Sequence, residues 1–194
     1  MPLLTLYAKL GQLLRPKDEC LMTTYLEQGN ASLQQGEYLA AKEAYEKALR
    51  AGEEAAEVHM ALGHVAAMQG EWKTAVSHYT TALQHNPQEA YTYRFRGIAH
   101  YELRQYHSAL ADFNDAIRLS PYDDTAFWLR GRVFAALGDH AWAINSYTQA
   151  IELAPNEAIY YEDRAEAWER VGNGRLAQEE RQKSVNLSLK STHQ

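Results

Sequence analysis

The sequence predicts an all-α solenoid built from helical hairpins of equal length. Like residues recur every 34 positions along the 194-residue chain, among glycines, alanines and prolines. A fixed period of this size is the signature of a repeat architecture. Because a single hairpin cannot bury its own apolar face, neighbouring hairpins must stack against it. The recurring columns are Gly63, Gly97 and Gly131; Ala75, Ala109 and Ala143; and Pro87, Pro121 and Pro155.

Residues 1–21 are expected to form an amphipathic helix and a short linker. Apolar residues recur there at steps of three and four, and Pro16 ends the pattern. Three surfaces for the apolar face remain open: the first repeat of the same chain, a second copy of the chain, or shallow contact with a membrane. The apolar residues precede the basic ones, which is the wrong order for a secretory signal, so a cytoplasmic protein is expected.

The period divides residues 22–191 into five repeats, with a tail at residues 192–194. In each repeat, two helices of roughly 13 residues, each about 20 Å long, flank a turn such as Gln69-Gly70-Glu71. The first repeat lacks the terminal proline, but Gly52 can cap its second helix. The fifth has Arg181 where the others have an aromatic residue, which is typical of a solubilising end cap. The repeats span residues 22–55, 56–89, 90–123, 124–157 and a degenerate 158–191.

Three kinds of column predict how the hairpins pack. A glycine inside a helix costs about 1 kcal/mol relative to alanine, so the glycine column indicates a close approach by another helix. The alanine column is the expected opposite contact. An aromatic column on the second helices is expected to fill the space between hairpins; it contains Tyr45, Tyr79, Phe113 and Tyr147. Long side chains on the first helices are interpreted as packed stems with solvated heads, at Arg96, Arg130 and Arg164.

The repeat units resemble a known family. The second unit reads AEVHMALGHVAAMQGEWKTAVSHYTTALQHNP, and this unit and its two successors are similar to tetratricopeptide repeats. The resemblance covers residues 22 to about 191. It implies a right-handed superhelix whose concave face is lined by the first helix of each hairpin. It also implies that this face binds peptide segments of other proteins.

Carried over position by position, the resemblance places a peptide-binding surface on the first helices. The first two repeats supply an adaptable apolar part with two methionines. The third and fourth supply aromatic and arginine side chains, which are enriched among binding hot spots. The fifth supplies an acidic end at Glu162, Glu166 and Glu169. The predicted peptide-binding residues are Leu26, Asn30, Met60, His64, Met68, Tyr91, Arg94, Ile98, Tyr101, Trp128 and Arg132.

Two expectations concern the polar and aromatic members of this set. Its tyrosines and its tryptophan are expected to be exposed to the ligand, because the packing columns have aromatic residues of their own. For its two arginines, either they receive a carboxylate of the ligand or they pair within the chain, with Glu102, Glu162 or Glu166. The subfamily that holds the acidic tails of heat-shock chaperones is excluded, because only Asn30 of its carboxylate clamp is present.

Several functional classes are excluded by the sequence. It has no glycine-rich phosphate loop and no metalloprotease motif, so no catalytic residue and no cofactor is predicted. His64 alone in the binding surface does not make a metal site, and His59 and His100 occupy packing columns. A formal net charge of −6 argues against nucleic-acid binding. No apolar run approaches the roughly 18 residues of a membrane span.

The sequence therefore predicts a protein-protein interaction adaptor or scaffold rather than an enzyme. Its partner is expected to be a protein or peptide segment with two or three bulky apolar anchors and a carboxylate near the two arginines. Two alternatives stay open. One is a self-assembling scaffold, such as a homodimer, formed through the N-terminal helix. The other is a chaperone for secreted proteins.

Overall fold

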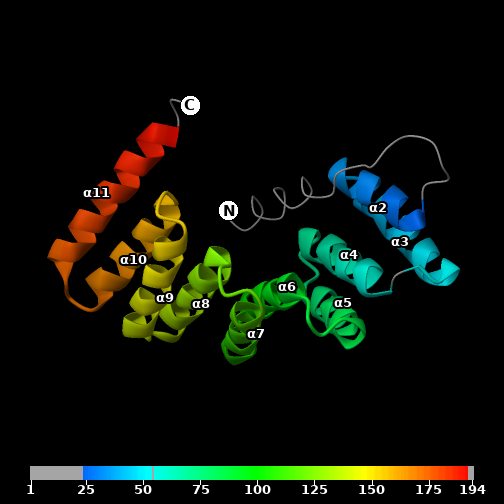
Figure 1. Cartoon of the computed structure of the whole chain (residues 1–194), viewed down its shortest axis with the longest axis horizontal. Helices are drawn as coiled ribbons and strands as arrows, with labels where there is room; N and C mark the ends of the chain where they lie inside the picture. Colours follow the sequence, from blue (N-terminus) through cyan, green and yellow to red (C-terminus); the bar gives the residue numbers. More distant parts are fainter. Residues whose placement is uncertain (1–23, 54, 192–194) are drawn as a thin grey trace. The chain divides into compact units, whose positions relative to one another are not determined.

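The computed structural model describes residues 24–53 and 55–191 of the chain. Within these ranges the chain forms ten helices and no strand, and successive helices pair as hairpins (Figure 1). The predicted all-α class of helical hairpins is confirmed. The helices are α2 (Tyr25–Gln34), α3 (Tyr38–Ala51), α4 (Ala55–Met68), α5 (Trp72–His85), α6 (Ala90–Glu102), α7 (Tyr106–Leu119), α8 (Asp124–Leu137), α9 (His140–Leu153), α10 (Ala158–Arg170) and α11 (Gly174–Ser191).

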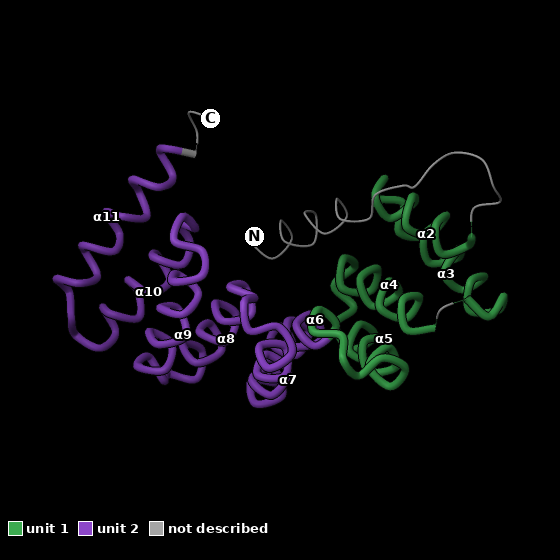
Figure 2. Tube along the Cα trace, viewed as in Figure 1, with its two compact units in different colours: residues 1–92 green, residues 93–194 purple. Residues whose placement is uncertain are grey.

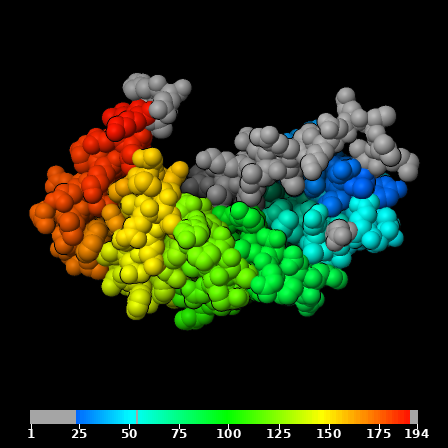
Figure 3. All heavy atoms as spheres, viewed as in Figure 1, coloured from blue at the N-terminus to red at the C-terminus, as the bar shows by residue number. Residues whose placement is uncertain are grey.

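The chain divides into two compact units, and the boundary lies inside α6 (Figure 2). Unit 1 runs to Thr92 and contains α2 to α5; unit 2 runs from Tyr93 and contains most of α6 and all of α7 to α11. In unit 2, α8 and α9, α9 and α10, and α10 and α11 pack in chain order (Figure 3). The predicted helix within residues 1–21 and the predicted tail at residues 192–194 lie outside the described residues.

The helix ends follow the predicted stop signals. Asn86, Ser120 and Ala154 are the C-cap residues of α5, α7 and α9, and a proline follows each cap directly. Gly52 caps α3 in the left-handed conformation, with φ 76°, as the sequence predicted for a repeat without that proline. The third hairpin turn differs from its equivalents, because Arg104 adopts a positive φ of 57° where the other turns have glycine.

The close approach predicted at the mid-helix glycines is confirmed, but the opposing atoms are not alanines. A β-carbon on Gly63 or Gly131 would lie 2.5 Å from the ring of Tyr79 or Tyr147. The rings stand sixteen positions after each glycine, and each lies over the glycine of its own hairpin. These rings therefore pack inside their own hairpin, and the prediction that they fill the space between hairpins stays a prediction.

The prediction that the guanidinium groups of the arginine column are solvated is also wrong. This column contains Arg96, Arg130 and Arg164. Arg96 donates to both carboxylate oxygens of Asp112, at 2.7 and 3.0 Å, and Arg164 donates to Glu180 at 2.7 Å. These acceptors lie on the second helix of the same hairpin, sixteen residues later. Each guanidinium also lies over the aromatic ring three residues before it. Packing of the two helices therefore buries most of each guanidinium group instead of leaving it in solvent.

Arg130 occupies the same column without a carboxylate partner. It donates to Ser146 Oγ at 3.2 Å, to Asn114 Oδ1 at 3.2 Å and to Gln149 Oε1 at 2.8 Å. Burial lowers the pKa of Arg130, because no anion offsets its desolvation. Burial also raises the pKa of Asp112, although Arg96 and its hydrogen bonds act in the opposite direction.

Candidate functional site

In one column of the predicted binding surface, here called the inner column, each residue is paired with an aromatic residue on the second helix of the same hairpin. This column contains Asn30, His64, Ile98 and Arg132, each fifteen positions before a ring. The Tyr45 hydroxyl donates to Asn30 Oδ1 at 2.8 Å, and the Tyr79 hydroxyl lies 2.8 Å from His64 Nδ1. The third repeat has Ile98 in the column and Phe113, which has no hydroxyl, as its ring. In the first two repeats the column residue thus supplies the hydrogen-bond partner that a buried tyrosine hydroxyl needs.

The remaining predicted residues of unit 1 differ in exposure. Leu26 is partly buried and packs against the apolar cluster formed by α3 and α4. Met60 and Met68 on α4 are also partly buried. Tyr91, at the start of α6, is 52% exposed, as expected for a ligand contact. The structure thus leaves Tyr91 as the most accessible of these four side chains.

Arg94 is committed to an ion pair inside unit 2. Its Nε lies 3.3 Å from Oδ2 of Asp123, and the two side chains are 7% and 8% exposed. Asp123 also accepts a hydrogen bond from the amide of Ala126 at the start of α8. Of the two interpretations left open, pairing within the chain is correct for Arg94, although its partner is none of the predicted glutamates. The sequence missed this partner because Asp123 lies in a loop outside the repeat columns considered.

Trp128 is buried, which contradicts its predicted exposure. The side chain is 5% exposed, and its Nε1 donates a 2.7 Å hydrogen bond to Oδ2 of Asp163 on α10. Its ring also packs against Tyr160, with the ring centroids 5.6 Å apart. Ile98, another predicted ligand contact, is fully buried. Trp128 is covered because α10, the next first helix, packs against α8 and supplies both of its partners.

Arg132 is held between two aromatic rings. Its guanidinium carbon lies 5.3 Å from the ring centroid of Tyr101 and 5.2 Å from that of Trp128, within the range of cation–π attraction. The Nη1 atom is buried and has no hydrogen-bond partner among the described residues. A buried donor without an acceptor is costly. Arg132 is therefore oriented by its neighbours while part of its hydrogen-bonding capacity is unused.

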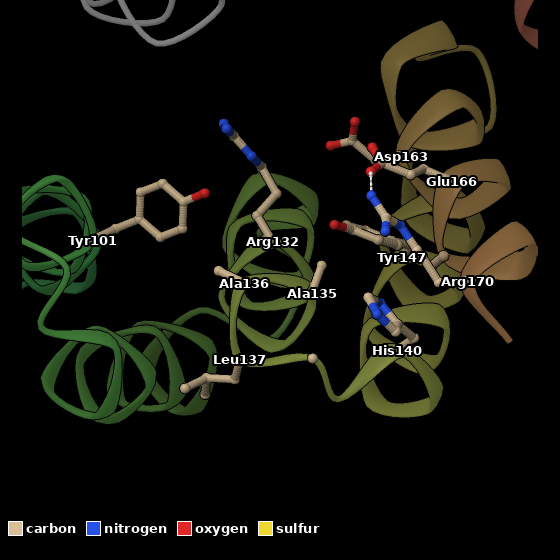
Figure 4. A pocket seen from close by; sticks show the side chains of 12 residues that line it. Tyr101, Arg132, Ala135, Ala136, Leu137, His140, Tyr147, Asp163, Glu166 and Arg170 are labelled. Atoms are coloured by element: carbon tan, nitrogen blue, oxygen red, sulfur yellow. Dashed lines mark ion pairs between the residues drawn. The ribbon is translucent and has the colours of Figure 1, made fainter.

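An open pocket of about 590 Å³ lies beside this guanidinium in unit 2 (Figure 4). The end of α8 supplies a floor of small residues, Ala135, Ala136 and Gly138, and Ala167 continues it on α10. Polar side chains surround the floor, and the figure shows them arriving from α6, α8, α9 and α10. The polar and aromatic lining residues are Tyr101, Arg132, His140, Tyr147, Asp163, Glu166 and Arg170.

Some charged side chains around the pocket are paired with each other, and others are not. Arg170 forms an exposed ion pair with Glu166 at 3.5 Å, drawn as a dashed line in Figure 4. Burial raises the pKa of Asp163, while the hydrogen bond from Trp128 and the charge of Arg132 act in the opposite direction. Nδ1 of His140 is buried and has no hydrogen-bond partner in residues 24–53 and 55–191. The pocket therefore offers a planar cation, and Arg132 is the cation without a paired carboxylate.

The predicted acidic end of the surface is neutralised within the chain. Arg181, on α11, lies 3.7 Å from Glu162 and 2.5 Å from Glu169. The substitution of the fifth aromatic by arginine was visible in the sequence, and it was the available signal for this pairing. Asp163 and His140 had no comparable signal, because neither lies in a column that the repeat pattern assigns to the binding surface.

Two further observations concern the described ranges alone. No group of three histidine, cysteine, aspartate or glutamate side chains there is arranged to hold a metal ion. No helix of the described part combines the length and apolar character that crossing a membrane requires.

Comparisons with known proteins agree with the repeat architecture. Three models, each described as tetratricopeptide repeat, match residues 26–90, 62–133 and 125–157. A crystal structure of MamA is 23% identical, with a TM-score of 0.80, and the match covers 86% of this chain and 97% of that one. MamA of Desulfovibrio magneticus RS-1 is 20% identical, with a TM-score of 0.79 and coverage of 95% and 96%. No curated protein sequence matches significantly.

A third solved structure is similar at the level of the fold. YrrB, described as a TPR protein with an unusual peptide-binding site, is 22% identical to this chain. The TM-score is 0.72, and the match covers 88% of this chain and 91% of YrrB.

Proposed function

Because this chain belongs to the tetratricopeptide-repeat family, we propose that it is an interaction scaffold that binds a peptide segment of a partner protein in its groove. The observation that carries the proposal is the Arg132 pocket in unit 2. The YrrB structure supports this mode of binding, since a protein of similar fold has a peptide-binding site. The sequence predicts no competing catalytic site.

The pocket favours a peptide that carries a carboxylate next to an apolar side chain. A ligand carboxylate would accept hydrogen bonds from the part of the Arg132 side chain that lines the pocket, and arginine–carboxylate pairs form strong, directional hydrogen bonds. The alanines of the floor would accept an apolar side chain beside it. Stacking between Tyr101 and Trp128 fixes the guanidinium before the ligand arrives, which reduces the entropy lost on binding. The predicted carboxylate contact is therefore assigned to Arg132 and withdrawn from Arg94.

Affinity capture from native lysate, followed by mass spectrometry, tests this assignment. The full chain and its Arg132→Gln variant serve as baits, and Arg118→Gln is the matched control because Arg118 is exposed on α7. The proposal expects a partner that the wild type and the control retain and that Arg132→Gln loses, with helicity unchanged in all three. A partner held equally by Arg132→Gln would contradict it. Trp128 is unsuitable for this test, because removing a buried ring would also unfold the surface.

A self-assembling scaffold is a second candidate, supported by the amphipathic pattern of residues 3–14. Deleting residues 1–20 and measuring the mass by light scattering distinguishes the two. A dimer that becomes a monomer on deletion supports self-assembly, and a full chain that is already monomeric rejects it. If the capture instead recovers one aggregation-prone apolar segment, the chaperone alternative gains support.

A further inference from the structure

Three histidines of unit 1 gather where α4 meets α5. Nδ1 of His59 lies 3.2 Å from Nδ1 of His78. The His59 ring also stacks on His85, with 6.2 Å between the centroids and 9° between the planes. His59 and His78 are partly buried, and His85 is exposed. The cluster lies outside the Arg132 pocket, and the proposed function does not use it.

The contact between His59 and His78 has room for one proton. In the neutral pair, one ring donates its N–H and the other accepts with its lone pair. When both rings are protonated, both facing nitrogens carry hydrogen and both rings carry charge. The hydrogen bond is then lost, and two cations oppose each other at contact distance.

The surrounding charges do not remove this conflict. Burial lowers the pKa of both His59 and His78. His85 adds a further lowering for His59. From α3, Lys42 lowers the pKa of His78 and Glu46 raises it, as the smallest of its four influences. The surroundings of His59 and His78 therefore favour the neutral rings, so protonation in mild acid is unfavourable at this site.

The other histidine pair of this hairpin behaves differently. His64, also on α4, faces the hydroxyl of Tyr79 on α5 at 2.8 Å. A hydroxyl can accept a hydrogen bond from a protonated ring, so protonation of His64 does not oppose two cations. Acid sensitivity of the α4–α5 contact is thus assigned to His59 and His78.

From this geometry we infer that His59 and His78 form an acid-sensitive latch that fastens α4 to α5 when neutral and releases the hairpin when both are protonated. The direction follows from linkage. A histidine whose pKa is lowered in the folded state stabilises the fold fully above the unfolded value of about 6.5. As the pH falls below that value, the unfolded chain binds protons that the folded hairpin does not, and the stabilisation is lost. Release would loosen α4, which carries the predicted binding residues Met60, His64 and Met68.

The test compares the full chain with His59→Phe. The chain itself supplies this control, because the same column holds Tyr25, Tyr93, Phe127 and Tyr161 in the other repeats. Between pH 7.5 and pH 5.5 the melting temperature of the wild type should fall further than that of His59→Phe, because only the wild type has the stabilisation of the neutral pair to lose. Equal falls in the two proteins would overturn the latch.

NMR titration of the histidine rings gives an independent readout. In the wild type, His78 should titrate below 6.5, and His59→Phe should move it back toward that value. The variant His78→Ser, which copies Ser146 of the fourth repeat, should restore His59 in the same way. If both histidines titrate near 6.5 in the wild type and neither moves in the variants, the inference is wrong.

Discussion

The indole nitrogen of Trp128 donates a 2.7 Å hydrogen bond to Asp163, and this bond joins α8 to α10. The same indole ring is one of the two rings that hold the guanidinium of Arg132. Asp163 therefore acts on Arg132 in two ways: it fixes the ring against which the arginine stacks, and it contributes a negative charge to the same pocket. The geometry of the pocket thus depends on a residue outside the predicted binding set.

Replacing Trp128 by phenylalanine should lower the free energy of unfolding by about 1–3 kcal/mol, because a buried carboxylate loses its hydrogen-bond donor while an aromatic ring remains. Urea denaturation monitored by circular dichroism measures the change. The matched control is Trp142→Phe, since Trp142 is 63% exposed and its substitution should change stability by less than about 0.5 kcal/mol. Equal effects at the two sites would show that the hydrogen bond contributes nothing.

Removing the charge of Arg132 should raise the pKa of Asp163. Burial already raises that pKa, and Arg132 opposes the rise, so Arg132→Gln leaves burial with less opposition. Carbon-13 NMR of the aspartate carboxyl groups measures the pKa in both proteins. A raised folded pKa also means that this group favours the folded state as the pH falls through it, and Asp163→Asn should abolish that contribution. An Asp163 pKa that is unchanged or lower in Arg132→Gln contradicts the arrangement described.

Alanine at Gly131 should destabilise the protein, although alanine is the better helix former. The new β-carbon would lie 2.5 Å from the Tyr147 ring, and overpacking of this kind costs about 1–3 kcal/mol. At Gly174, the first residue of α11, no atom lies within 4 Å of the added carbon, so Gly174→Ala should stabilise by up to about 1 kcal/mol. Thermal melts of the two variants should therefore shift in opposite directions. Two stabilising substitutions would disprove the close approach.

Glycine at position 104 should stabilise the third hairpin by about 0.5–1 kcal/mol, the left-handed strain relieved less the entropy that glycine adds to the unfolded chain. Arg104 has φ 57°, whereas the equivalent Gly70 and Gly138 adopt φ 75° and 86° without a β-carbon. Arg104→Ala is the control, because it removes the long side chain and keeps the strain. Chemical denaturation should rank Arg104→Gly above both the wild type and Arg104→Ala. If alanine stabilises as much as glycine, the backbone conformation is not the cause.

The repeat period was sufficient to predict the hairpins, because glycine, alanine and proline columns report local needs: a close contact, a small contact and a helix end. Partners between helices were less predictable. Asp112 and Glu180 lie in one column, and each accepts a hydrogen bond from an arginine sixteen residues before it. The same column has Ser146 in the fourth repeat, and this serine alone does not predict the neutral acceptors that Arg130 has there. Both partners of Trp128 lie in the next repeat, at Tyr160 and Asp163, whereas a 34-residue period relates equivalent positions and not neighbouring ones. The pocket was missed for the same reason.

The arginine column also bears on how the protein would come apart under load. Arg164 bonds to Thr148 in the preceding hairpin as well as to Glu180 in its own, and Arg130 likewise reaches back to Asn114. Arg130 and Arg164 thus each join two consecutive hairpins, whereas the second repeat has Leu62 in this column, and leucine has no donor. In a repeat array, cooperativity depends on such coupling between neighbours. Under a pulling force, the hairpins of unit 1 should therefore unfold one at a time. The hairpins of unit 2 that these hydrogen bonds join should unfold together in a single step.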